Sequence, residues 1–315
     1  MGLVSPSIRS VTQADVRVAL SRRDRKISGQ LLQVFLLFAV MATLLVLFTL
    51  LARVMTDALP LLKVRGTTFL TETIGSDPDT IGIFPGLYGS FFIGIGVLLI
   101  AVPLGIATAI YLEEYASPDR WYNRIIMVNI RNLAGVPAVI YGVLGLVIFV
   151  GWLRPVTNGR TVLAAALTLA VLVLPIVIIT SSEAIRAVPQ GIRDAGYGVG
   201  ASKWEVNRDH VLPYAAPGIL TGTMLSLARA LGEAAPLILL GAITGRLPQT
   251  GLRERFTGLP MLIYNWSAEA NPKGSSLGFE NAAAATSLIL LLLVLMFNII
   301  AIRMRTRYER KRVGS

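Results

Sequence analysis

The chain has 315 residues, of which 54% are hydrophobic and 15% are charged, whereas about 25% of residues are charged in an ordinary soluble domain, so an integral membrane protein is favoured. The net charge of +11 comes from basic residues at the termini and in loops between apolar segments, so we expect anionic membrane lipids, and not nucleic acid, as partners. With no cysteine and a single histidine, the sequence excludes disulfides and predicts neither a metal site nor a bound cofactor.

Six apolar segments are each long enough to cross a bilayer core, which is about 30 Å thick and needs about 20 helical residues. The predicted spans are residues 31–52, 88–112, 127–152, 162–181, 215–241 and 283–302. The first run is too long for a cleavable signal and has no small-residue cleavage site, so we expect it to be retained. The predicted fold class is all-α, with one six-span domain over 31–302 between a basic segment, 1–30, and a basic tail, 303–315.

The distribution of lysine and arginine predicts which side of the membrane each loop faces. If both termini lie on one side, that side carries eighteen of the 29 basic residues and the opposite side carries nine. Loops rich in lysine and arginine face the cytoplasm, so we expect both termini and the loop 182–213 to be cytoplasmic. Residues 53–86 contain Gly, Asp and Pro turn signals and are expected to form an outer loop.

The first half of the third span is expected to be irregular. Gly135, Pro137 and Gly142 interrupt it, and Arg131 lies near its entrance. Non-helical backbone at membrane depth is tolerated only where it lines a cavity or packs against protein. Arg131 either adds a positive charge to a solute path or, as we favour, contacts lipid headgroups.

The cytoplasmic loop 182–213 is predicted to contain a short helix followed by a bend. Pro189 suits the beginning of a helix over residues 190–198. The helix is expected to end in the glycine-rich run 198–200, because glycine adopts a left-handed backbone at little cost.

A second short helix is predicted after this bend. Ser202 and Glu205 have the spacing of a capping box, and the helix is expected to stop before Pro213. An alternative is a helix that lies in the membrane interface. Its anchors would be Lys203, Trp204 and Arg208.

The predicted fifth span contains two charged residues, Arg229 and Glu233, four positions apart and therefore on one helix face. A charge at membrane depth costs roughly 2.5–3.5 kcal/mol even on the mildest insertion scale. The pair either neutralises itself and pins two helices together, or it serves a solute path. In the second case Arg229 presents a guanidinium fork to an oxyanion, and Glu233 keeps binding weak enough for release.

No site for energy coupling is visible in the sequence. A Walker phosphate loop needs Gly-Lys-Ser/Thr, and no lysine of the chain follows a glycine. If ATP drives transport, its hydrolysis is expected in a partner chain, so the protein is predicted not to be an enzyme.

The stretch DAGYGVGASKWEVNRDHVLP resembles the EAA loop of ABC-transporter permeases. The matching positions are Asp194, Ala195, Gly196, Gly200, Leu212 and Pro213. Asp stands in place of the usual Glu, Gly in place of the second Ala, and His210 in place of an aliphatic residue. The resemblance implies that this loop docks in the groove of a cytoplasmic ATPase. It adds as expected contact residues Ser202, Lys203, Trp204, Glu205 and His210.

Further stretches, among them NLAGVPAVIYG and LARALGEAAPLIL, resemble phosphate-transport permeases of the PstA family over about residues 88–302. The resemblance implies a type I importer permease fold (MetI-like) in the bacterial cytoplasmic membrane. It also implies a PstC-like second permease, a dimeric PstB-like ATPase and an external PstS-like phosphate-binding protein as partners. Inorganic phosphate would pass Arg229 and Glu233 by alternating access.

Other functions remain open at this point. They are a permease of the same architecture for sulfate or molybdate, an ion-coupled carrier or channel that acts alone, and a membrane scaffold without a solute path. The segment 257–267 either dips into the bilayer or lies on its surface.

Overall fold

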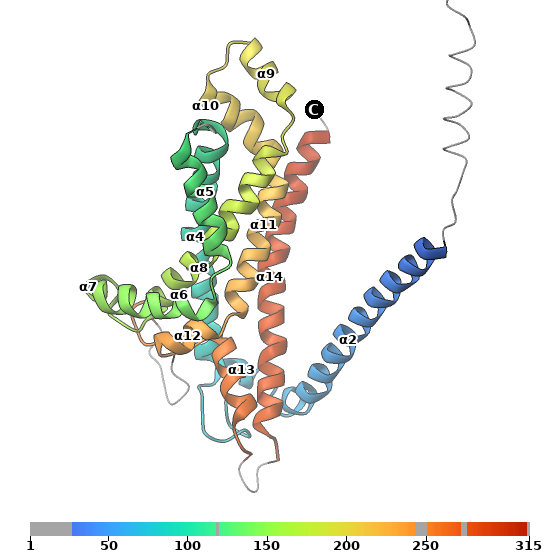
Figure 1. Ribbon diagram of the computed structural model, residues 1–315. Coiled ribbons are helices and arrows are strands. Elements are labelled where there is room, and N and C mark those ends of the chain that lie inside the picture. Colours follow the sequence, from blue (N-terminus) through green and yellow to red (C-terminus); the bar gives the residue numbers. More distant parts are fainter. Residues whose placement is uncertain (1–26, 118–119, 243–250, 272–275, 314–315) are drawn as a thin grey trace, which may run out of the picture. The chain divides into compact units, whose positions relative to one another are not determined.

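The computed structural model describes residues 27–117, 120–242, 251–271 and 276–313 (Figure 1). Helices dominate this part of the chain, whose β-structure is one isolated bridge between Thr161 and Arg255. The predicted all-α fold class is confirmed. The chain divides into two compact units, Met1–Arg53 and Val54–Ser315.

Helix α2 (Ile27–Arg65) begins in the first unit and ends in the second. Its large apolar side chains between Leu31 and Leu51 are exposed. An unbroken surface of this kind suits lipid and not water. The helix contains the predicted first span and continues beyond it to Arg65, so the first part of the predicted outer loop 53–86 is helical.

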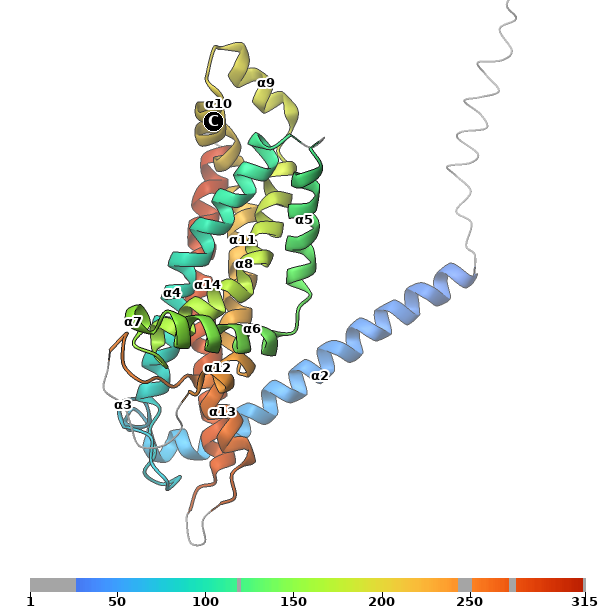
Figure 2. The same cartoon turned by 60° about the vertical axis from the view of Figure 1, so that its left-hand side comes forward.

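The second unit is a helical bundle in which α4, α8, α11 and α14 run side by side (Figures 1 and 2). Its helices after α2 are α3 (Thr68–Thr71), α4 (Phe84–Ile110), η1 (Tyr111–Tyr115), α5 (Trp121–Ala134), α6 (Ala138–Gly145), η2 (Leu146–Trp152), α7 (Arg154–Thr157), α8 (Val162–Arg186), α9 (Gln190–Gly198), α10 (Lys203–Val206), η3 (Asn207–Val211), α11 (Leu212–Gly232), α12 (Ala235–Leu240), α13 (Leu259–Ala268) and α14 (Phe279–Val313). The η segments are single stretches of π-helix.

Helix α8 is the most enclosed of the long helices and packs against α4, α5, α6 and α11. Ala164, Ala165 and Ala170 are buried along it. Small side chains let neighbouring helices approach closely, which is how helices associate in membranes, where lipid is as apolar as leucine.

Five helices of the described residues are long and apolar enough to cross a membrane, and a sixth crossing results if the pair Trp121–Ala134 and Ala138–Trp152 counts as one span. This pair is bent by 101°. The bend lies at 135–137, where Pro137 directly precedes α6. The predicted irregularity of the third span is therefore confirmed.

The prediction that the second helix of the loop 182–213 stops before Pro213 is wrong. The chain is helical without interruption from Lys203 to Gly232, with Pro213 in the first turn of α11 and Pro217 inside it. Directly before Pro213, η3 has the wider hydrogen-bond pattern of a π-helix. A π-turn shifts the register of the helical backbone hydrogen bonds by one residue. Here the shift comes just before a proline, which has no N–H to donate to these bonds.

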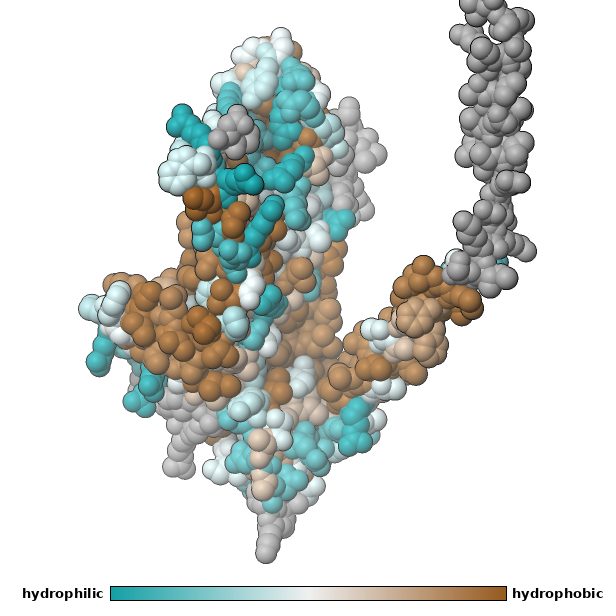
Figure 3. Space-filling view, in the orientation of Figure 1, coloured by the Kyte–Doolittle hydropathy of each residue, from teal (hydrophilic) through white to brown (hydrophobic). Residues whose placement is uncertain are grey.

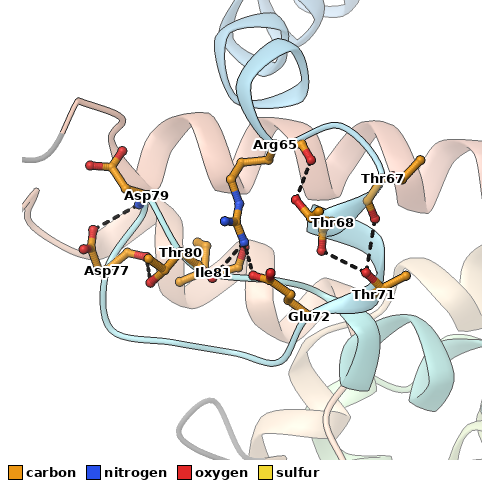
Figure 4. A network of polar contacts seen from close by, with 9 residues as sticks. All are labelled: Arg65, Thr67, Thr68, Thr71, Glu72, Asp77, Asp79, Thr80 and Ile81. Carbon is orange, nitrogen blue, oxygen red and sulfur yellow. Dashed lines mark hydrogen bonds and ion pairs between the residues drawn. The ribbon is translucent and has the colours of Figure 1, made fainter.

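Arg65 fixes the end of α2 to the loop that follows (Figure 4). Its guanidinium forms an ion pair with Glu72 and donates to the carbonyl oxygens of Thr80 and Ile81 at 2.8 and 3.2 Å. The later part of the predicted outer loop is thus an ordered turn with the short helix α3.

Asp79 joins the same loop to the beginning of α14. Its carboxylate accepts hydrogen bonds from the Ser276 hydroxyl (2.8 Å), the Ser276 N–H (3.0 Å) and the Leu277 N–H (3.1 Å). These bonds, the Ser276 hydroxyl first, hold the pKa of Asp79 below its ordinary value. The segment 257–267 forms most of α13, which packs against α14 and α4.

Candidate coupling loop and translocation site

The loop after α8 folds into α9, a bend and α10 at one end of the bundle (Figure 1). Gly200 in the bend has a φ of 83°, a left-handed backbone that suits glycine. Ser202 and Glu205 form the predicted capping box: the Ser202 N–H donates to the Glu205 carboxylate at 2.7 Å, and the Glu205 N–H donates to Ser202 Oγ at 3.4 Å. Hydrophilic side chains gather over this end (Figure 3).

Gly196 allows α9 to lie against α10. It is buried, and a Cβ at this position would stand 2.8 Å from Cγ2 of Val206 and 3.4 Å from Cδ2 of His210. Val206, Val188 and Ile185 belong to a small apolar core beneath the loop. The loop is therefore a packed element with its own core.

Arg193 ties α9 to the end of the second span. Its guanidinium donates to Glu114 at 2.8 and 3.1 Å and to the carbonyl oxygens of Val188 (2.6 Å) and Ile185 (3.0 Å). The side chains of Arg193 and Glu114 are only 12% and 6% exposed. Water screens such a pair little, so the contact is stiff.

Two further contacts join η1 to the end of α8 and to α10. Arg186 at the end of α8 donates to both carboxylate oxygens of Glu113, at 2.6 and 3.1 Å. The Lys203 ammonium lies 5.0 Å from the centre of the Tyr115 ring, within cation–π distance. Contacts from α8, α9 and α10 therefore converge on η1, which continues α4.

Most residues predicted to contact an ATPase are exposed. They are Asp194, Ala195, Gly200, Ser202, Lys203, Trp204, Glu205, His210 and Pro213. Gly196 is buried and Leu212 is half-buried against the small core, so these two support the loop from inside. The bend also presents Val199, 83% exposed, and Tyr197, which sequence reasoning did not single out.

The predicted fifth span is broken in the structure. Helix α11 ends at Gly232, Glu233 has an extended backbone (φ −89°, ψ 108°), and α12 begins at Ala235. The prediction that Arg229 and Glu233 share one helix face is therefore wrong. The Pro236 ring favours the start of a new helix and cannot extend the old one.

The helix that follows this break packs against the helix that follows the break between α5 and α6. Helices α6 and α12 pack together, and a Cβ at Gly142 would stand 2.8 Å from the Cα of Pro236. The Tyr141 hydroxyl donates to the carbonyl oxygen of Leu133 at 2.8 Å, which joins α6 to the end of α5. The second halves of the two interrupted helices, α6 and α12, thus lie against each other.

Arg229 lies one turn before the break of α11 and is exposed, whereas Glu233 in the break is half-buried. No ion pair links these two described residues. The two predicted pathway residues therefore lie next to and in the break of α11, and they do not form an ion pair with each other.

Arg131 lies in the last turn of α5 and lines a cavity of about 440 Å³. Arg124, Arg186 and Glu113 line the same cavity, and Asn123 in its wall is buried with its side-chain amide oxygen Oδ1 unpaired. The cavity lies between η1, α5 and the end of α8. Arg131 is therefore part of a basic cavity in the protein.

Sequence reasoning missed Arg193, Glu113, Glu114 and Tyr141. The adjacent carboxylates after the second span were a visible signal, but their arginine partners are 73 and 79 residues away in the chain. In the described residues, no cluster of three or more His, Asp or Glu side chains could hold a metal ion.

Comparison with known proteins identifies the family. Residues 101–313 match the family described as the binding-protein-dependent transport system inner membrane component. The chain is 34% identical over 226 residues to the phosphate transport system permease protein PstA of Mycobacterium leprae, covering 72% of each chain. It is 31% identical over 277 residues to the phosphate transport system permease protein PstC of Mesorhizobium japonicum, covering 81% of each.

Solved structures have the same fold at lower identity. An inward-facing MetNI methionine ABC transporter matches with a TM-score of 0.53 at 19% identity, over 72% of this chain and 94% of that one. A bacterial alginate ABC transporter matches with a TM-score of 0.60 at 15% identity, over 89% of this chain and 96% of that one. The predicted type I importer permease fold is confirmed.

The family match covers most of the bundle, including the coupling loop and both broken helices, and the helices are those of a multi-pass membrane protein. Transport, and not catalysis, is the role that the family description gives. The chain belongs to the family of binding-protein-dependent transport system inner membrane components.

Proposed function

We propose that this chain is the transmembrane permease subunit of an ATP-driven ABC importer that carries inorganic phosphate into the cell. Relatives at 31–34% identity bear the names PstA and PstC, which denote phosphate transport system permeases. Its partners would be a PstC-like second permease, a dimeric PstB-like ATPase and an external PstS-like phosphate-binding protein.

The observation that carries the proposal is the meeting of two broken helices beside Arg229. Backbone that leaves helical geometry at membrane depth is tolerated where it lines a water-filled path or packs on protein. Here α6 and α12, the helices that follow the breaks at 135–137 and Glu233, pack against each other, and the exposed Arg229 lies one turn before the second break. A guanidinium fork matches two phosphate oxygens.

Basic side chains continue from this point toward the coupling loop. Arg131 and Arg124 are seven residues apart on α5, so they lie on similar faces about 10 Å apart along the helix axis. Arg186 lines the same cavity. Several weak sites in a row let an anion enter and leave, whereas one strong site would retain it. These arginines would form the inner part of the path.

Force would enter through α9. Arg193 of α9 contacts η1, and Arg186 at the end of α8 and Lys203 of α10 contact η1 beside it. These contacts would connect a docked ATPase to the second span. Closure of the ATPase dimer would move α9 as a rigid element. In this arrangement both termini and the loop after α8 lie in the cytoplasm, as the positive-inside bias requires.

The first test is phosphate uptake by the complete transporter in proteoliposomes with Arg229→Gln and Arg229→Lys. Loss of charged hydrogen bonds worth about 1.5–3 kcal/mol lowers uptake by roughly 10- to 100-fold in Arg229→Gln, with Arg229→Lys between it and the wild type. Arg303→Gln, an exposed arginine on α14 away from the breaks, is the matched control and should leave uptake unchanged.

A double variant separates a path residue from a structural charge pair. If Arg229 only balances Glu233, then Arg229→Gln with Glu233→Gln restores uptake. If Arg229 serves the anion, uptake stays low while the partner subunits still co-purify. Restored uptake would refute the role of Arg229 proposed here.

Sulfate is the most similar competing solute, because it has the same tetrahedral shape. Glu233 beside the path could accept a hydrogen bond from a protonated oxyanion, which phosphate is at neutral pH and sulfate is not. We therefore expect excess sulfate to leave labelled phosphate uptake unchanged. Strong inhibition by sulfate would assign the transporter to another oxyanion, and phosphate flux through the chain alone would favour an ion-coupled carrier.

A further inference from the structure

A cavity of about 410 Å³ is lined by residues that belong to none of the sites described above. It opens between the end of η2, the turn at 158–161 and the segment 251–255. Guanidinium groups dominate its wall. The charged residues that line it are Arg154, Arg160, Arg253, Arg255 and Glu254.

Backbone contacts hold the walls of this cavity together. Asn158 ends α7 with a left-handed backbone (φ 64°). Its side-chain N–H donates to the carbonyl oxygen of Arg253 at 3.1 Å. Thr161 forms an antiparallel bridge with Arg255, and the Leu163 N–H donates to the carbonyl oxygen of Leu252 at 3.1 Å. The segments that carry the arginines are therefore held together by specific hydrogen bonds.

The charge of the cavity is not balanced within the described residues. Four of its lining residues are arginines and one is a glutamate, and none of these five side chains forms an ion pair there. Like charges held this close repel one another unless an anion joins them. A tetrahedral oxyanion has the size, charge and acceptor geometry for such a set of guanidinium forks.

The cavity is one short helix away from the pair of breaks. A Cβ at Gly241, directly after α12, would stand 2.8 Å from Nη1 of Arg160, so this guanidinium lies against the end of α12. Glu233 lies in the break before the other end of α12, and Arg229 lies in the last turn of α11 before that break. With six residues, α12 is about 9 Å long.

We propose that this arginine cavity is a second oxyanion site, which captures inorganic phosphate before it reaches Arg229. The inference rests on the proposed function for the identity of the anion and for the direction of transport. A basic cavity raises the local concentration of an anion and its rate of entry, and salt weakens this effect. The cavity would thus feed the path.

The test is binding and uptake of labelled inorganic phosphate by the complete transporter in nanodiscs and proteoliposomes. The variant Arg253→Gln with Arg255→Gln removes two charges from the cavity. We expect it to lower kcat/KM for phosphate by about tenfold at low ionic strength, with a smaller loss at high salt. Glu254→Gln, which removes the opposing charge, is expected to raise kcat/KM, and the double lysine variant is expected to keep most of it.

Lys63→Gln is the matched control, because Lys63 is exposed in the same predicted outer region and does not line the cavity. It should leave uptake and its salt dependence unchanged. Equilibrium dialysis of phosphate against the transporter without its binding protein gives a second measure, in which the double glutamine variant should bind less.

Two outcomes would overturn the proposal. One is unchanged phosphate binding with a raised KM for the external binding protein, which would make the cavity a docking surface for an acidic protein. The other is no change in either quantity. Failure of the proposed function looks different: the wild type would import sulfate and not phosphate, and the cavity variants would then be measured with sulfate.

Discussion

Gly196 allows close packing within the proposed coupling loop because it has no side chain. Glycine at this position brings α9 within van der Waals distance of Val206, which is fully buried, and of the ring of His210. His210, expected on the docking surface, is exposed there and also contacts α9. The same residue type two positions later, Gly198, has open space around it.

This difference makes a matched pair of variants. Gly196→Val should push α9 away from α10 and cost about 1–3 kcal/mol in local packing, whereas Gly198→Val should not. Hydrogen exchange followed by mass spectrometry should then be faster over residues 190–198 in the first variant alone. Equal exchange in both variants would mean that α9 does not depend on this contact.

At the scale of elements, the ion pair between Arg193 and Glu114 links α9 to η1. Glu114 receives two hydrogen bonds from Arg193, and both side chains are nearly buried. By contrast, the ion pair between Arg208 and Asp209 joins residues adjacent in sequence, and their side chains are 60% and 46% exposed. Exposed pairs of that kind contribute about 0–1 kcal/mol.

Glu114→Gln should therefore uncouple the transporter. Loss of a charged hydrogen bond worth about 1.5–3 kcal/mol loosens α9 from the second span, so phosphate uptake should fall at least about tenfold while ATP hydrolysis continues. Asp209→Asn, in the exposed pair, should change neither. Parallel loss of uptake and hydrolysis in Glu114→Gln would point to failed assembly, which co-purification of the ATPase measures separately.

The whole chain presents more apolar surface than a soluble monomer tolerates. Exposed large apolar side chains cover much of α5, α6 and η2, among them Trp121, Ile126, Val139 and Val147. Figure 3 shows part of this surface as a continuous apolar area. Such an area requires lipid or a partner subunit, in agreement with membership in a family of inner membrane transport components.

The proposed orientation can be measured directly, because the sequence contains no cysteine and each introduced thiol is the sole reactive one. Glu269→Cys, exposed after α13, should react with a membrane-impermeant maleimide in intact cells. Arg120→Cys, exposed before α5, should react after permeabilisation alone. The reverse pattern would place the coupling loop outside the cell and contradict the proposed function.

The sequence by itself determined the features that depend on local chemistry. Hydrophobic length predicted a helical membrane protein, the spacing of Ser202 and Glu205 predicted their capping box, and Gly135 with Pro137 predicted a break in the third span. These outcomes follow from residues a few positions apart, whose interactions form wherever the rest of the chain lies.

Only the tertiary structure decided which distant groups meet. The pairing of Arg193 with Glu114, the approach of α6 to α12 and the arginine cavity all join segments separated by many residues. The break at Glu233 also escaped the sequence, because a spacing of four residues suggests one helix face whether or not the helix continues. Helix packing selects these contacts through shape and backbone approach over the whole bundle, and no short stretch of sequence carries that information.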